Sequence, residues 1–448
     1  MASPHEPPAA PPPAGSFRTW TTGYLPWISA ILSVLSARVF ASGAAFLSNV
    51  LVARYLGPED FNSFYLLFAI MTIVAGLTGP AIDTSLVRFA VKQITPERDG
   101  SAPYFKFVLY LKTAILFITL ALGLALAGPL LHWLFAAGAP VPEYAIALAF
   151  LGGAVVSLWG FSQSFFQAHQ RFGHFAGYEF CSALLRLGLV IGLIGGGLRH
   201  VLIYLVVYVL APFVMGIMSW TQLPRSLFTS PTTLAIGRDF LRFAKWVLLA
   251  TIFTTLTQRL DLLLLNLKAY HIPKESIGHY SAALSLVLAG ELVLLTFYNV
   301  LLPKASSLHS AGELRRFIGD FRIPSMLFCL ATSLMIPLSG PFRRIAFGEA
   351  YIGTEAYFTI LLLGVIVAIG TAPTVTALYS LGHSRTMAAF EVARLLLTLA
   401  LGLWAVPRYG IFGMAWVMTA VRAVISATMY LVAHQTVKRQ MIREYTTS

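Results

Sequence analysis

Five charged residues lie within long apolar stretches of the sequence, where an unpaired charge is costly. They are Arg38, Asp83, Arg259, Asp261 and Glu291. A charge near the middle of a bilayer is tolerated where it faces a cavity or an opposite charge. Arginine stays protonated when desolvated and grips phosphate through two parallel hydrogen bonds, whereas a buried carboxylate is suited to taking up and releasing a proton. The set therefore predicts an anion-binding cavity with ion-coupling groups beside it.

Two of these residues have no opposite charge near them along the chain. Arg38 lies among small residues in VLSARVFASGAAF, with no carboxylate within one helical turn. Glu291 lies in LVLAGELVLLTFYN, with no cation three or four positions away. Arg38 either binds an anion or pairs with another helix. Glu291 either couples a proton or pairs with Arg38 or Arg259 across a cavity. The two roles are compatible if protonation of Glu291 releases the arginine.

The other three residues are distinguished by their local sequence. Arg259 and Asp261 are two positions apart, so they point to different faces of a helix and do not simply pair with each other. Asp83 follows GLTGP at 76–80, in which two glycines and a proline can break a helix. Asp83 therefore either caps the restarted helix or acts as a gating group at irregular backbone.

Further charges in the apolar stretches have structural explanations. Glu391 and Arg394 are three positions apart on one helix face and can neutralise each other. Lys112 is expected to extend its amine along the helix to the membrane surface. Arg422, in the last apolar stretch, is expected to lie outside a central cavity.

The composition indicates a membrane protein. Of the 448 residues, 57% are hydrophobic and only 11% are charged, whereas a soluble domain carries about 25% charged residues. The apolar residues form runs of roughly 20, the length that crosses a bilayer as a helix. The predicted fold class is an all-α polytopic membrane protein with about twelve transmembrane helices. The predicted spans are 28–53, 62–84, 104–128, 143–167, 175–197, 200–220, 240–265, 279–302, 318–339, 355–380, 386–406 and 411–436.

The segments outside the spans predict the orientation. Residues 1–27, rich in proline and alanine, are typical of a disordered cytoplasmic tail rather than a removed signal peptide. The tail, the loops after even-numbered spans and residues 437–448 together carry more lysine and arginine than the loops after odd-numbered spans. Both termini are therefore expected in the cytoplasm. The same loops explain the net charge of +13 through contact with membrane lipids, without nucleic acid as a partner.

Internal similarity divides the spans into two groups of six. The turn GPEDFNSFY at 57–65 aligns with PKESIGHYS at 273–281, which places Asn62 opposite Gly278. Farther along each group, QAHQRFGHFAGYEF aligns with YSLGHSRTMAAFEV. Six spans return the chain to its starting side, so the repeats are parallel, a common construction in transporters. The prediction is an N-lobe at 28–220, a cytoplasmic linker at 221–239 and a C-lobe at 240–436.

Several motifs carry a family resemblance. ARYLGPEDFNSFY resembles the turn after the first helix of bacterial polysaccharide and O-antigen flippases, in the multidrug/oligosaccharidyl-lipid/polysaccharide exporter superfamily. Asn62 stands where that turn usually has glycine. RFAKWVLLATIFTTLTQRLDLLLL is similar to their seventh helix, IGHYSAALSL to the start of the eighth and PRYGIFGMAWVMT to the start of the twelfth. The resemblance covers nearly everything after the N-terminal tail.

The resemblance implies a function. Two six-helix lobes would form a V around a cavity that opens to each side of the bacterial cytoplasmic (inner) membrane in turn. The cargo would be an oligosaccharide on undecaprenyl diphosphate, moved from the inner to the outer leaflet for cell-surface polysaccharide such as O-antigen of lipopolysaccharide. Arg38 and Arg259 would bind the diphosphate, while Glu291, Asp261 and Asp83 would couple ions or gate. Polysaccharide polymerase machinery would then be a partner.

Two alternatives to a flippase stay open. A cation-coupled drug antiporter of the same superfamily would rely on intramembrane carboxylates, but the arginines are at least as prominent here and favour an anionic cargo. A membrane polymerase or ligase would carry a long outer loop with catalytic residues, and the predicted outer loops are short. We therefore expect no enzyme activity. Cys181 and Cys329 have no metal-ligand spacing and the sequence has no phosphate-binding glycine loop, so neither a metal nor a cofactor is expected.

Overall fold

The structure is a computed structural model that describes residues 39–94, 99–135, 141–231, 234–306, 311–380 and 384–447. These residues form helices and short connections, and the one β-type contact recorded among them is an isolated bridge between Ile94 and Asp99. The all-α fold class is therefore confirmed. Arg38 lies outside the described residues, as does the N-terminal tail.

The described residues of the first half of the chain form seven helices. The first runs over Val39–Leu56. The others are α2 (Pro58–Thr78), α3 (Pro80–Val91), α4 (Ala102–Leu134), α5 (Tyr144–Ala168), α6 (Phe172–Gly195) and α7 (Val201–Trp220). The turn before α2 is sharp because Gly57 takes a φ of +80°, which a residue with a side chain rarely adopts. Pro58 then starts α2, where its missing N–H costs nothing, and two acidic residues follow in the first turn.

The second half begins with a short helix and ends with a very long one. Its helices are α8 (Ser226–Thr229), α9 (Leu234–Leu265), α10 (Lys274–Ser306), α11 (Ala311–Asp320), α12 (Arg322–Ser333), α13 (Ser339–Ala346), α14 (Thr354–Ser380) and α15 (Ser384–Thr447). Two single 3-10 turns, Lys268–Tyr270 and Glu349–Tyr351, lie in the connections. α9 starts within the stretch 221–239 that the sequence assigns to a linker.

The described residues contain ten helical stretches long and apolar enough to cross a membrane, against twelve predicted spans. One reason is that α15 covers both 386–406 and 411–436, joined across a kink at Gly410 with φ 56° and ψ −137°. The other is that the predicted span 318–339 falls on α12, which has only 12 residues before the chain turns toward α13. The apolar runs therefore predicted where the helices lie, but the connections between some of the helices differ from the prediction.

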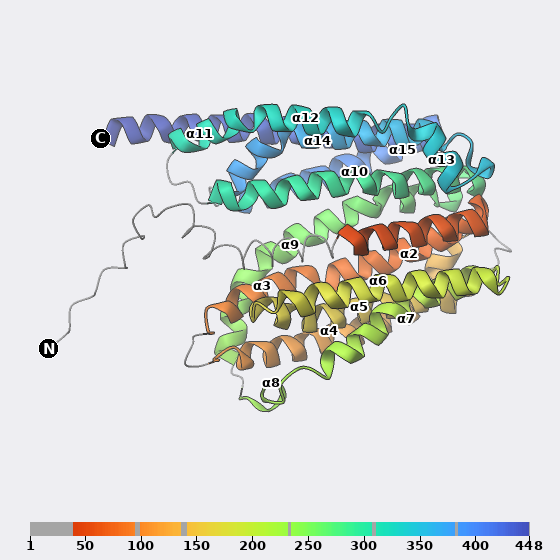
Figure 1. Ribbon diagram of the computed structural model, residues 1–448, viewed down its shortest axis with the longest axis horizontal. Helices are drawn as coiled ribbons and strands as arrows, with labels where there is room; N and C mark the ends of the chain where they lie inside the picture. The colour runs from red at the N-terminus through yellow and green to blue at the C-terminus, as the bar shows by residue number, and fades with distance from the viewer. Residues whose placement is uncertain are drawn as a thin grey trace, which may run out of the picture.

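The helices form two groups that meet at one end of the molecule (Figure 1). One group holds α2 to α7 and the other holds α10 to α15. α9 runs diagonally between them. Near its start, Phe240 packs against Phe89 and Phe107 of the first group, with ring centroids 5.8 Å apart in each case. Near its end, Leu264 contacts Gly402 of the second group, so α9 belongs to both groups.

The two groups are joined where α2 and α10 begin. A β-carbon at Gly278 would lie 2.0 Å from the carbonyl oxygen of Pro58, so only glycine permits this approach. One turn farther on, the Asn62 side-chain amide donates a 2.9 Å hydrogen bond to the side-chain oxygen of Asn266. The Tyr351 hydroxyl also donates to the carbonyl of Ala53, at 2.7 Å. We call this the closed end of the molecule.

Candidate functional site

A cavity of about 280 Å³ lies between α9, α10, α14 and α15, with one residue of α2, Tyr65, on its wall. It brings together three of the five charged residues singled out from the sequence, namely Arg259, Asp261 and Glu291. Two more arginines, Arg394 and Arg422, also line it. Five charged side chains therefore share one small space, which we call the charged cavity.

Asp261 is fully buried at the end of the cavity nearest α10. Its carboxylate accepts a 2.7 Å hydrogen bond from the Tyr280 hydroxyl and a 2.8 Å bond from the backbone N–H of Leu262. A buried carboxylate needs such donors, because its desolvation is otherwise uncompensated. Asp261 is thus held by neutral donors and not by Arg259, as the two-residue spacing indicates.

Arg259 rests on aromatic rings. Its guanidinium carbon lies 5.8 Å from the centre of the Tyr65 ring and 5.9 Å from that of Phe68. Among the described residues, no carboxylate lies within ion-pairing distance of this guanidinium. The Tyr65 hydroxyl beside it is buried and has no hydrogen-bond partner in this part of the chain. Arg259 and Tyr65 are therefore donors available to an anion.

Glu291 pairs with Arg422, at 2.6 Å between carboxylate oxygen and guanidinium nitrogen. Of the two alternatives for Glu291, the partner in the structure is thus Arg422 rather than Arg38 or Arg259, and proton coupling stays a prediction. Arg422, expected outside a central cavity, lines the charged cavity. The kink at Gly410 turns the second part of α15 back along α14, and Arg422 passes Gly364 to reach α10. Both side chains keep about a third of their surface exposed (32% and 29%), so the pair faces open space.

Arg394 forms the predicted ion pair with Glu391, one turn before it on α15. Its Nε atom is nevertheless buried without a hydrogen-bond partner in the part of the chain that the structure describes. Sequence analysis gave Arg394 and Arg422 structural roles only. The sequence feature that could have indicated a site role was their position in apolar stretches. That position shows that the charge is unusual, but it does not show which helix the charge faces.

Asp83 lies apart from this cavity, at the break between α2 and α3. The break predicted at Gly79 and Pro80 is confirmed, since α2 ends at Thr78 and α3 begins at Pro80. Asp83 pairs with Lys112 of α4 at 2.7 Å, and Lys112 also donates to the Ser157 carbonyl at 2.6 Å. The absence of a side chain at Gly160 makes room for the Asp83 carboxylate.

Lys112 does not extend to the membrane surface as expected, because its side chain is fully buried. The ammonium finds a carboxylate and a carbonyl inside the first group of helices, and this compensates its desolvation better than a partial reach toward water. Whether Asp83 gates transport stays a prediction. In the structure, Asp83 is held in an ion pair with Lys112.

Replacing Lys112 by methionine is expected to lower the free energy of unfolding by about 3–5 kcal/mol, because Asp83 would be left as an uncompensated buried charge. The measurement is the thermal unfolding midpoint of the purified protein in detergent. The double variant Asp83→Asn/Lys112→Met should recover most of the loss. A single variant as stable as the wild-type protein would contradict the account of this pair.

Comparison with known families identifies the chain. The family model described as "Polysaccharide biosynthesis protein" matches residues 29–309, more than half of the sequence. The chain belongs to this family. The resemblance drawn from the sequence motifs is therefore confirmed, and the described residues contain ten helical stretches that could cross a membrane.

Solved structures show the fold of this polysaccharide biosynthesis protein. The lipid II flippase MurJ in an inward closed conformation superposes with a TM-score of 0.72 at 14% identity, covering 90% of this chain and 87% of that one. An inward-facing multidrug resistance MATE family transporter of the MOP superfamily gives 0.73 at 15% identity, covering 89% and 95%. A MOP superfamily transporter from Pyrococcus furiosus gives 0.60 at 14%, covering 90% and 96%. The curated proteins searched by sequence gave no match.

Proposed function

We propose that this polysaccharide biosynthesis protein translocates an oligosaccharide linked to undecaprenyl diphosphate from the inner to the outer leaflet of the bacterial cytoplasmic membrane. The observation that carries the proposal is the charged cavity, where Arg259, Arg394 and Arg422 meet between α9 and the second group of helices, beside Tyr65 of α2. Arginine is the residue best suited to a desolvated phosphate. The family match supports a role in polysaccharide biosynthesis. A cell-surface polysaccharide such as O-antigen is the product that the proposal assigns.

The size of the charged cavity suggests which part of the cargo it takes. At about 280 Å³ it is at the lower limit of small-molecule sites, which run from about 300 to 1,000 Å³. A diphosphate fits this space and an oligosaccharide does not. We therefore assign the diphosphate to the cavity and the glycan to the space between the two groups of helices, toward α2 and Tyr65.

The pairing of Glu291 with Arg422 supplies a means of coupling. While Glu291 is ionised it neutralises Arg422, and protonation of the carboxylate would release the guanidinium for the cargo. Binding of an anion by the arginine would in turn favour release of the carboxylate from its partner. Asp261, held by Tyr280, is a second candidate for ion coupling because it lines the same cavity. Asp83 is a third, acting at the helix break.

The closed end is consistent with one state of alternating access. Pro58 against Gly278 and Asn62 against Asn266 seal the side on which α2 and α10 begin. We place this side toward the outside of the cell and both termini in the cytoplasm, in line with the distribution of basic loops. Opening would then separate these contacts while the opposite side closes.

Arg38 remains a predicted ligand for the diphosphate. Replacing Arg38 by alanine is expected to reduce flipping about tenfold, the effect of losing roughly one charge-assisted hydrogen bond. The measurement is the amount of surface polysaccharide in cells that make the variant at the wild-type protein level. Unchanged polysaccharide at matched protein level would remove Arg38 from the proposal.

The proposal as a whole is tested by deleting the gene and analysing the cell lipids by mass spectrometry. The expected result is accumulation of one completed sugar repeat unit on undecaprenyl diphosphate, reversed when the protein is restored. This result would identify the cargo as well as the activity. No accumulation and normal surface polysaccharide would overturn the flippase assignment, and assays of organic-cation efflux would then test the antiporter alternative.

A further inference from the structure

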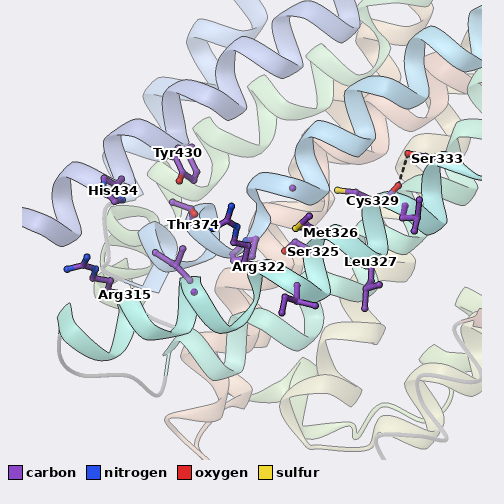
Figure 2. A pocket seen from close by; sticks show the side chains of 16 residues that line it. Arg315, Arg322, Ser325, Met326, Leu327, Cys329, Ser333, Thr374, Tyr430 and His434 are labelled. Carbon is purple, nitrogen blue, oxygen red and sulfur yellow. Dashed lines mark hydrogen bonds between the residues drawn. The ribbon is translucent and has the colours of Figure 1, made fainter.

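A second and larger cavity lies on the side of the second group of helices, away from the charged cavity. It is a groove of about 1320 Å³ lined by residues of α11, α12, α14 and α15. Figure 2 shows its walls, with Tyr430 and His434 of α15 facing Arg315 and Arg322. The proposed flippase function makes no use of this groove. We call it the lateral groove.

One end of the lateral groove is basic. Arg315 of α11, Arg322 at the start of α12 and His434 of α15 gather there, near the end of the molecule at which the chain terminates (Figures 1 and 2). Among the described residues, the lining includes no aspartate or glutamate. Of the described carboxylates, none forms an ion pair with Arg315 or Arg322. Both guanidinium groups can therefore contact an anion directly.

The rest of the lateral groove is apolar. Along α12, Ile323, Met326, Leu327 and Leu330 are exposed, each by 60% or more. Its floor is formed by Gly370, which has no side chain, and by Pro373, a residue that cannot close the usual helical hydrogen bond of α14. Tyr430, half exposed, lies at the junction of the basic and apolar parts, as aromatic residues do at a membrane interface.

We propose that the lateral groove binds an anionic phospholipid from the leaflet that meets this end of the molecule. A basic pocket between transmembrane helices holds the phosphate of a lipid headgroup. The apolar wall of α12 then accepts an acyl chain, which a soluble anion does not have. A protein partner would leave the basic end without a matching charge unless it were acidic and at membrane depth, where acidic residues are rare. The charge and the depth of the groove together favour the lipid.

The first test counts lipid bound to the purified protein by native mass spectrometry. The probe is phosphatidylglycerol, with phosphatidylcholine as the uncharged comparison. Arg315→Gln/Arg322→Gln is expected to weaken retention of one phosphatidylglycerol about 30-fold. Each arginine near an anionic lipid surface strengthens binding by about five-fold, and the double variant loses both contributions. Arg225→Gln/Arg238→Gln removes the same charge from exposed sites outside the groove and should retain the lipid. Equal loss in both double variants would overturn the site and indicate a general surface effect.

The second test reports occupancy from within the groove. Cys329 lines it and is partly buried, while the other cysteine, Cys181, is exposed elsewhere. In a Cys181→Ser protein reconstituted in vesicles, phosphatidylglycerol is expected to slow alkylation of Cys329 by a lipid-soluble maleimide several-fold relative to phosphatidylcholine. The protection should disappear in the Arg315→Gln/Arg322→Gln variant. Equal rates in both lipids, or protection only by undecaprenyl phosphate, would overturn the assignment to phospholipid.

A pair of substitutions at Gly370 separates the acyl part from the charged part. A β-carbon here would meet only the Cys329 sulfur, at an ordinary contact distance of 3.7 Å. Gly370→Ala should therefore retain phosphatidylglycerol, whereas Gly370→Phe fills the floor and should release it with both arginines intact. Retention by the phenylalanine variant would show that the lipid does not enter the groove.

Discussion

Replacing Arg259 by glutamine is expected to reduce flipping of the lipid-linked oligosaccharide by about 10- to 100-fold, the loss of a charge-assisted hydrogen bond to phosphate. The effect should be large because Arg259 has no carboxylate partner among the described residues. Its guanidinium is therefore open to direct contact with the cargo, whereas those of Arg394 and Arg422 already contact a carboxylate. The measurement is surface polysaccharide and accumulated lipid intermediate in a deletion strain carrying the variant.

Two controls separate binding from folding. Arg259→Lys keeps the charge over the Tyr65 and Phe68 rings but loses the two-pronged geometry, so an intermediate loss is expected. Arg225→Gln, at the exposed residue that precedes α8, should leave flipping unchanged. The thermal midpoint of the Arg259→Gln protein must stay near that of the wild type. If flipping is then normal, the charged cavity does not hold the diphosphate.

Replacing Gly278 by alanine is expected to lower the rate of flipping strongly, because it disrupts the closed end. The new β-carbon would lie 2.0 Å from the Pro58 carbonyl oxygen, which is backbone and cannot rotate away. Overpacking of this kind costs about 1–3 kcal/mol, enough to depopulate the closed end by about 5- to 150-fold. Flipping should fall by a similar factor, because alternating access requires this contact to form in each cycle.

The loss of closure can be measured directly. In a protein without its native cysteines, Asn62→Cys and Asn266→Cys report the closed end by cross-linking with a short bifunctional reagent, because the native side chains are 2.9 Å apart. Gly278→Ala should lower the cross-linked fraction. Gly188→Ala is the matched control, since a β-carbon there meets no atom within 4 Å. Normal cross-linking and normal flipping in the Gly278 variant would show that the contact is not part of the cycle.

Together these experiments distinguish the two proposed sites. The charged cavity and the closed end bear on transport of cargo, whereas the lateral groove bears on a bilayer lipid and can be tested without any flipping assay. A protein that loses phosphatidylglycerol on substitution of Arg315 and Arg322, but flips cargo normally, would still have a lipid site. A protein without cargo flipping would leave that result unchanged.

Features that depend on neighbours along the chain could be predicted from the sequence. Apolar runs of membrane-spanning length located the helices, and the glycines and proline before Asp83 located the break between α2 and α3. The spacing of Arg259 and Asp261 excluded a direct pair, and that of Glu391 and Arg394 predicted one. Each of these predictions depends only on residues within one or two turns of each other along the chain.

Which distant charges meet could not be predicted from the sequence, because it depends on how the helices pack. Arg422 reaches Glu291 because α15 bends at Gly410, and Lys112 reaches Asp83 because α4 packs beside the break in α2 and α3. An apolar helix has no strongly polar face to show how it is rotated in the bundle, so its sequence does not indicate which neighbour a charge will face. That rotation is set by side-chain packing between helices far apart in the chain. This packing brings charges from separate helices together in one cavity.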